Sequence, residues 1–276
     1  MAIVNGYCTR TELINELDDN SGTTLSTTRL DLIAEQASRL VEAYTGRQFY
    51  PTVETRYFTP AYNDWLSVDD LLAVTTLKTD DGNREYATTW AATDYDLLPA
   101  NSLDKDEPYS MIRRTPLSTQ YFPTVRLGAQ IVGRWGYYEV PAATGATLNG
   151  DITAAATSVV VSDGTLLSVG HVLKIDDEYL RVDVIATNTL TVIRGANGST
   201  AATHSSGATL YALTFPGITM ATLRLATRLW HLRKAPMGIA VAGVQGLTGG
   251  TAGTRWIQRD WDLQNMLAPY SGGKML

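Results

Sequence analysis

Basic side chains recur on one narrow face of a helical segment in the last quarter of the sequence. Arg224, Arg228 and His231 are spaced at i, i+4 and i+7, which places them on the same side of a helix. Arg233 and Lys234 follow directly. Such a row of cations can bind an acidic surface on a protein partner, or it can be an ordinary solvated helix face. Both interpretations stay open on the sequence.

Residues that could support catalysis or hold a metal do not gather in the sequence. The histidines at 171, 204 and 231 have no second ligand at metal-binding spacing, so no zinc site is predicted. The run Asp176-Asp177-Glu178 could offer oxygens to Ca²⁺, but it lacks the alternation of a calcium loop and fits a hairpin turn. The glycines between 243 and 250 have no Lys-Ser/Thr after them, as a phosphate-binding loop would. The sequence therefore predicts no catalytic, cofactor-binding or metal-binding residues, no cofactor and no enzyme.

Composition narrows the class of protein. The chain has 276 residues, of which 44% are hydrophobic, so it can bury a sizeable core. Its formal charge of −6 and its isoelectric point near 5.1 argue against a protein that grips nucleic acid phosphates. A single cysteine, Cys8, allows no intrachain disulfide, which fits assembly in a reducing cytoplasm. The sequence shows neither a basic leader nor an apolar run of membrane-spanning length, so no membrane partner is expected.

The cations lie on a predicted helix over residues 217–234, which we take as the centre of the fold. One face of this helix, expected to face the core, consists of Ile218, Ala221, Leu225, Leu229 and Leu232. A second apolar stripe beside it consists of Leu223, Ala226 and Trp230. One apolar face is enough for a helix at the edge of a domain. The second stripe therefore predicts contact with another chain.

Two further helices are predicted near the start of the chain. Thr9 and Glu12 form a capping box before a helix at 10–17. A longer amphipathic helix at 28–45 should end at Gly46 in a left-handed conformation. This longer helix is the expected packing partner of 217–234.

The middle of the chain has the composition of β-strands. Short runs rich in Tyr, Thr, Val and Trp predict strands at 53–58, 73–78, 86–90, 109–114 and 124–135, with a hairpin turn at 81–83 and a long exposed loop at 98–108. A second set of strands is predicted at 159–161, 171–175, 179–185, 190–193 and 208–211. We interpret residues 144–212 as a small β domain, a barrel or a sandwich, inserted into a host domain made of 1–143 and 213–276. The predicted fold class is thus α+β, with a small helical bundle core, a β-rich flank and an inserted all-β domain.

The C-terminal region combines a glycine-rich arm at 240–254 with an aromatic tail that contains a short helix capped by Asp260. Trp, Tyr and Arg are the residue types that anchor interfaces, so the tail is expected to dock onto a partner. The interface residues predicted from the central helix and the tail are Arg224, Arg228, Trp230, His231, Arg255, Trp256, Trp261, Leu263, Met266, Leu267 and Tyr270.

Five sequence features together resemble the head-tail connector, or adaptor, family of long-tailed bacteriophages. They are the Thr-x-x-Glu opening of the first helix and the segments TGRQFY at 45–50, RWGY at 134–137, LWHLRKAPMG at 229–238 and MLAPY at 266–270. Their order is more specific than any one of them. They cover about the first 140 residues and everything after Gly217, while the inserted domain departs from the family pattern.

The resemblance implies a structural virion protein, assembled in the host cytoplasm. Members of such a family form a ring, commonly of about twelve copies, between the capsid portal and the next tail-side protein, which is a connector, a stopper or a tail tube protein. DNA passes through the lumen of the ring during ejection without specific binding. The C-terminal tail of the family engages the portal. The alternative that stays open is a tail-associated structural protein that binds the host surface or a glycan, with the inserted domain as its binding module.

Overall fold

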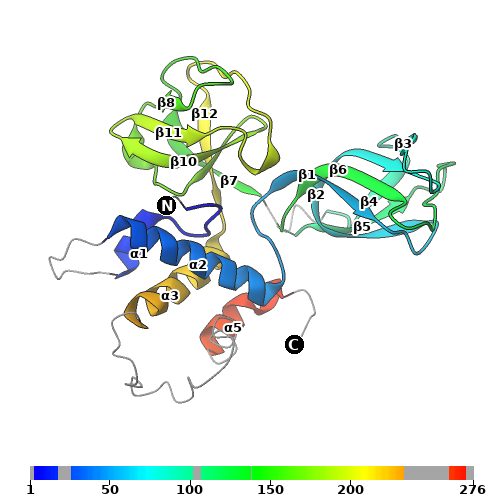
Figure 1. Ribbon diagram of the computed structural model, residues 1–276, viewed down its shortest axis with the longest axis horizontal. Coiled ribbons are helices and arrows are strands. Elements are labelled where there is room, and N and C mark those ends of the chain that lie inside the picture. The colour runs from blue at the N-terminus through cyan, green and yellow to red at the C-terminus, as the bar shows by residue number, and fades with distance from the viewer. Residues whose placement is uncertain (1–2, 18–25, 102–106, 138, 233–260, 272–276) are drawn as a thin grey trace. The chain divides into compact units, whose positions relative to one another are not determined.

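The computed structural model describes residues 3–17, 26–101, 107–137, 139–232 and 261–271, and this part of the chain is mostly β-sheet. It contains two six-stranded antiparallel sheets and four α-helices (Figure 1). Contacts divide the chain into two compact units. The first unit comprises residues 1–47, 141–196 and 200–276, and the second comprises 48–140 together with 197–199.

The helices belong to the first unit and begin and end where local sequence signals place them. They are α1 (Arg10–Leu17), α2 (Thr27–Thr45), α3 (Pro216–Leu232) and α5 (Trp261–Leu267), and the 3₁₀ turn Ala268–Tyr270 follows the last. The predicted capping box is confirmed, because the Thr9 amide donates to Glu12 Oε2 (2.7 Å) and the Glu12 amide donates to Thr9 Oγ1 (3.2 Å). Gly46 closes α2 with a φ of 68°. Helices α2 and α3 lie side by side, as predicted (Figure 1).

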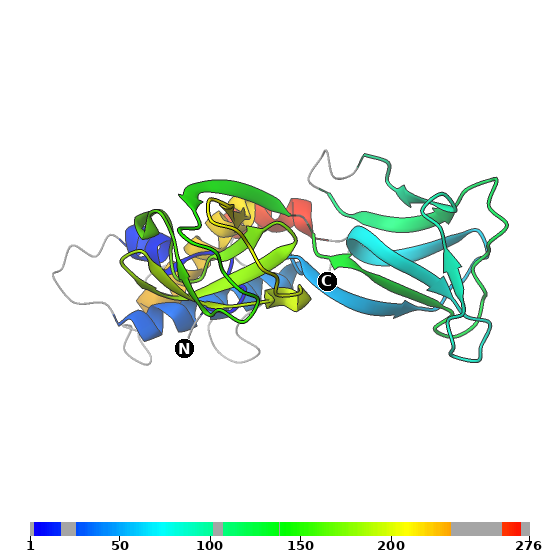
Figure 2. The same cartoon turned by 90° about the horizontal axis from the view of Figure 1, so that it is seen from above.

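The second sheet along the chain closes into a small barrel within the first unit. Its strands are β7 (Val140–Thr147), β8 (Ser158–Val160), β9 (Val172–Ile175), β10 (Glu178–Ala186), β11 (Thr189–Ile193) and β12 (Thr209–Thr214), in the spatial order β7-β12-β9-β10-β11-β8. The 3₁₀ turns Gly164–Leu166 and Ala196–Gly198 interrupt the connections. An antiparallel bridge between Leu148 and Val161, with the Asn149 amide donating to the Val160 carbonyl (2.8 Å), joins β7 to the end of β8. The two edges therefore meet, and the strands wrap round a filled interior (Figure 2).

The barrel interior is apolar and fully enclosed. Alternate residues of β11 point inward: Leu190 and Val192 are buried, whereas Thr191 and Ile193 are exposed. The buried cluster consists of Ala146, Leu148, Ile152, Val159, Val161, Leu167, Leu173, Ile175, Leu180, Val182, Leu190, Val192, Leu210 and Ala212. The barrel thus has a core of its own.

The second unit is built on the other sheet. Its strands are β1 (Thr52–Phe58), β2 (Trp65–Thr79), β3 (Thr88–Trp90), β4 (Tyr95–Leu98), β5 (Tyr109–Arg114) and β6 (Ala129–Trp135), in the order β1-β6-β2-β5-β4, with β3 paired to β2. The long strand β2 changes partner along its length. Its first part pairs with β5 and its later part with β6 and β3, and irregularities in register occur between Ser67 and Leu71 and again near Ala73 and Thr76.

A second apolar cluster fills this unit. It contains Leu66, Val68, Leu71, Leu77, Trp90, Ile112, Phe122, Ala129, Ile131 and Trp135. The Trp135 ring is fully buried, its indole N–H donates to the Glu54 carbonyl (3.0 Å), and the Arg56 guanidinium lies over the ring at 4.6 Å. Trp90 stacks on Phe122 with ring centroids 4.5 Å apart.

The predicted fold class, α+β with a small helical bundle core, is wrong. The described chain is mostly β-sheet, and no helical bundle core is present in it. Helical periodicity is easy to recognise over 17 to 19 residues, as in α2 and α3. All strands except the 15-residue β2 have three to nine residues, and such short strands give a weak signal, so the sequence overstated the helices. Two strands were missed altogether, β4 and β7, and the second half of β7 was taken for a polar connection. The division into 1–143 with 213–276 and an inserted 144–212 stays a prediction.

Candidate partner interface

The basic residues of α3 lie on the exposed side of that helix. Arg224, Arg228 and His231 are all exposed, at the spacing that the sequence predicts. Arg224 Nη1 is 3.9 Å from Asp262 Oδ2 of α5, and both side chains are well exposed, so this ion pair contributes little to stability. These three residues therefore form an exposed basic row along α3.

The tail helix α5 packs within its own unit. Leu263 and Leu267 are fully buried, and Met266 and Tyr270 are partly buried. A Cβ atom on Gly217 would lie 2.5 Å from the Tyr270 hydroxyl, so the tail packs closely against the first turn of α3. The apolar side of this helix is thus covered by the chain itself.

The remaining predicted interface residues divide into three groups. Trp230 is 3% exposed and belongs to the interior, whereas Trp261 is 73% exposed and projects from the start of α5. Arg255 and Trp256, like the capping residue Asp260, lie outside the described residues. The structure therefore brings Arg224 and the tail helix together, and partner contact by any of these residues stays a prediction.

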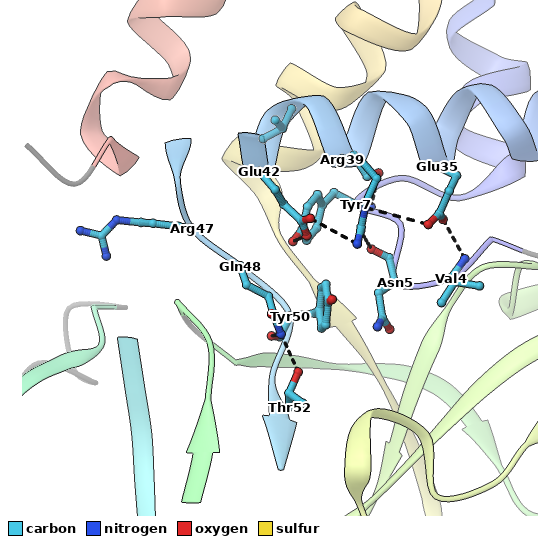
Figure 3. A network of polar contacts seen from close by, with 12 residues as sticks. Val4, Asn5, Tyr7, Glu35, Arg39, Glu42, Arg47, Gln48, Tyr50 and Thr52 are labelled. Carbon is cyan, nitrogen blue, oxygen red and sulfur yellow. Dashed lines mark hydrogen bonds and ion pairs between the residues drawn. The ribbon is translucent and has the colours of Figure 1, made fainter. Parts of the chain in front are cut away.

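The N-terminal segment is fastened to the outer face of α2 by a network of polar contacts (Figure 3). The Val4 amide donates to Glu35 Oε2 (2.9 Å), and Arg39 donates to the Asn5 carbonyl (2.7 Å) while it pairs with Glu42 (3.2 Å). The Tyr7 hydroxyl donates to Glu42. Burial raises the pKa of Glu42, and the bonds from Tyr7 and Arg39 oppose that rise only in part.

A small hollow between this segment and the barrel contains the lone cysteine. It has a volume of about 60 Å³ and includes Cys8, Glu12 and His171 in its lining. A Cys, a His and a Glu together could suggest a nucleophile. However, burial, and then the charge of Glu12, raises the pKa of the Cys8 thiol to about 12, so the reactive thiolate does not form. Burial likewise lowers the pKa of His171. The arrangement has the features of a packed interior.

A charged cluster inside the barrel was missed at the sequence level. Arg194 binds both carboxylate oxygens of Glu178, at 2.7 and 2.8 Å, and both side chains are almost wholly buried. His204 Nε2 lies 2.9 Å from Glu178 Oε2, and its Nδ1 lies 3.0 Å from Asp176 Oδ2. Arg194 also donates to the carbonyls of Thr153, Ala156 and Ala202.

The electrostatics of this cluster favour a permanently ionised carboxylate. Burial pushes the pKa of Glu178 upward, but hydrogen bonds from Arg194, the Ala202 amide, His204 and the Gly195 amide outweigh it and lower the pKa to about 2. The expected hairpin turn is confirmed at Asp176-Asp177, which lie between β9 and β10, and Asp176 has a φ of 50°. Glu178 is the first residue of β10, and nothing in the sequence indicates that it points inward to an arginine 16 residues away.

No group of three or more His, Cys, Asp or Glu side chains that could hold a metal ion occurs among the described residues. Within the same residues, no helix combines the length and the apolar character that crossing a bilayer requires.

Two of the sequence segments that carry the family resemblance meet within the second unit. The Tyr137 amide donates to the Gln48 carbonyl (2.9 Å), and the rings of Phe49 and Tyr137 lie 5.6 Å apart. Gly136 has a φ of 148°, and a Cβ there would lie 2.6 Å from the Tyr50 carbonyl oxygen. The segments RQFY and WGY are thus two sides of one contact, and the glycine is required by the close approach of the two backbones.

Comparison with known proteins finds a structural likeness but no match to a family or a curated protein. No protein-family model matches the chain, and no curated protein matches it. A solved structure described as the neck of an empty GTA particle computed with C6 symmetry aligns over 100% of this chain and 95% of its own, with 11% sequence identity and a TM-score of 0.44.

Proposed function

We propose that this chain is a structural virion protein of the head-tail connector class, which forms a ring between the capsid portal and the tail-side protein. The observation that carries the proposal is the contact between RQFY and WGY. Both segments belong to the connector resemblance, they are about 85 residues apart in the chain, and they pack on each other through Gly136. A resemblance made of unrelated short matches would not be expected to converge on one contact.

The exposed face of α3 and α5 is the surface that we assign to the portal or to a neighbouring subunit. Arg224 and Arg228 supply positive charge on α3, where His231 is also exposed, and Trp261 supplies an exposed aromatic side chain at the start of α5. Aromatic residues and arginine are the common anchors of interfaces. Leu263 and Leu267 act beneath this surface, because they hold α5 in place.

The charge of the chain is consistent with DNA passing through the ring. A net charge of −6 gives no general attraction to phosphates, so DNA would move past the subunits without being held.

The test is assembly with portal protein. The purified chain, alone and mixed with portal, would be imaged and its mass measured; the proposal expects rings whose diameter matches the portal. The double variant Arg224→Gln/Arg228→Gln removes two charges from the α3 face and should reduce portal binding.

Arg113→Gln/Arg126→Gln is the matched control, because it removes the same charge from exposed residues of the second unit and should bind as the unchanged chain does. A chain that stays monomeric with portal present would refute the connector proposal. Equal loss of binding in both double variants would refute the α3 assignment alone.

A further inference from the structure

An open hollow lies at the start of β2 in the second unit. Its volume is about 390 Å³, near the lower end of the range of about 300–1,000 Å³ for ligand sites. It is lined by the loop before β2, the first residue of that strand and one residue of a second loop, namely Ala61, Tyr62, Asn63, Asp64, Trp65 and Thr124.

Two stacked aromatic rings form the apolar part of this hollow. The rings of Tyr62 and Trp65 lie 4.4 Å apart between centroids and are inclined by 20°. Trp65 is the first residue of β2 and is fixed opposite Arg113 of β5. Tyr62 is 54% exposed, so its ring is accessible to a ligand. A large aromatic ring held at the surface over another ring is a ready platform for a flat apolar face.

The loop that carries these residues is held rigidly. The Phe122 amide donates to the Asn63 carbonyl (2.9 Å), and the Arg114 amide donates to the Asp64 carbonyl (2.9 Å). Arg114 Nε also donates to Asp64 Oδ1 (2.6 Å). Because two successive carbonyls and one carboxylate oxygen are fixed, little conformational entropy would be lost when a ligand binds.

The polar side chains of the hollow retain hydrogen-bonding capacity. Among the described residues none bonds to the Asn63 carboxamide, the Thr124 hydroxyl or Asp64 Oδ2. These groups can both donate to and accept from a ligand rich in hydroxyls. The lining contains no Lys or Arg, and the adjacent Arg114 is already paired with Asp64, so phosphate is disfavoured.

We propose that this hollow binds a neutral hexose or N-acetylhexosamine unit of a polysaccharide. A pyranose ring has an apolar C–H face that matches the exposed face of Tyr62, and hydroxyls round its edge that match the amide, carboxylate and hydroxyl beside it. The site does not depend on ring assembly. In a ring, repeated weak sites would act together and raise the affinity for a repeating glycan.

The experiment uses the full chain and four probes, the methyl glycosides of glucose, galactose, mannose and N-acetylglucosamine. Each probe is added up to about 50 mM, because a dissociation constant near the millimolar range is expected for a single site. Binding is measured by saturation-transfer NMR and by shifts of the indole N–H signal of Trp65. At least one probe should bind and shift that signal. Tyr62→Ala should weaken binding by at least about tenfold, and Tyr62→Phe should retain it because the ring remains.

Tyr57→Ala is the matched control. Tyr57 is 47% exposed, lies in the same unit and also pairs with an aromatic ring, Tyr86 at 5.5 Å, but it lies outside the hollow. It should bind sugar as the unchanged chain does. The proposal is overturned if no probe binds, or if Tyr62→Ala binds as well as Tyr57→Ala. It is also overturned if Tyr62→Ala changes the assembly state and leaves sugar binding intact, because the hollow would then be a contact between copies.

Discussion

Replacing Glu178 by glutamine should destabilise the barrel far more than an ordinary change of a charged residue. The variant keeps the size of the side chain but leaves Arg194 buried without its carboxylate, and both residues are at most 5% exposed. Lowering the pKa of Glu178 from 4.5 to about 2 corresponds to about 3 kcal/mol. Loss of one partner of a buried ion pair commonly costs about 3–5 kcal/mol, so the two estimates agree.

Asp183→Asn is the matched control on the same strand. Asp183 pairs with Arg181 at 3.0 Å, but both side chains are about one-fifth exposed, so the change should cost less than about 1 kcal/mol. The barrel segment, residues 140–214, contains no tryptophan, so the barrel has no fluorescence probe of its own. Hydrogen exchange of the amides of β9, β10 and β11 is the suitable assay. Their protection should fall about a hundredfold in Glu178→Gln.

The pH dependence of barrel stability gives a second, independent test of the role of Glu178. The folded barrel holds Glu178 ionised to a lower pH than the unfolded chain does, so its stabilisation is complete above about pH 4.5 and disappears as the pH falls towards 2. The difference in stability between the unchanged chain and Glu178→Gln should shrink over that interval. Equal protection in Glu178→Gln and Asp183→Asn, or a difference that does not change between pH 5 and 2, would refute the reasoning.

Three further predictions concern other parts of the chain. The Cys8 thiol should resist a disulfide reagent at pH 8 in the folded protein and react fully in denaturant, because its pKa is raised to about 12; rapid labelling of the folded chain would contradict its burial. Trp230→Ala should lower the free energy of unfolding of the first unit by about 3–5 kcal/mol, measured by calorimetry, because Trp230 is buried. A fully stable variant that fails to form rings would instead place Trp230 in an interface. Gly136→Ala should destabilise the second unit by more than about 1 kcal/mol, because the new Cβ would collide with the Tyr50 carbonyl. The change is measured by the fluorescence of Trp90 and Trp135 during melting. An unchanged melting curve would show that the two backbones can separate freely.

Local signals in the sequence were sufficient to place most elements. The capping box at Thr9 fixed the start of α1, and Gly46 fixed the end of α2, because both act through bonds to residues three or four positions away. The strand Tyr109–Arg114 was predicted with its observed bounds. Such features depend on neighbours in the chain, which the sequence displays directly.

Features that depend on distant residues could not be predicted. The burial of Glu178 is stabilised only by Arg194 and His204, and no pattern links the three in sequence. The apolar side of the tail looked like a surface for a partner because nothing in the sequence shows that Leu263 and Leu267 are covered by their own chain. Likewise, Tyr62 and Trp65 form a platform only because β5 and a loop near Phe122 hold them.

The strands at which the chain enters and leaves the barrel, β7 and β12, are neighbours in its sheet. The Thr144 hydroxyl donates to the Leu210 carbonyl (2.8 Å), which ties the two strands together at that point. When the two ends of a folded domain lie side by side, inserting that domain into another chain costs about as much entropy as inserting a short loop. A segment with this geometry is suited to exchange between genes by recombination as a single cassette, and the prediction that residues 144–212 are an insertion makes the barrel such a segment.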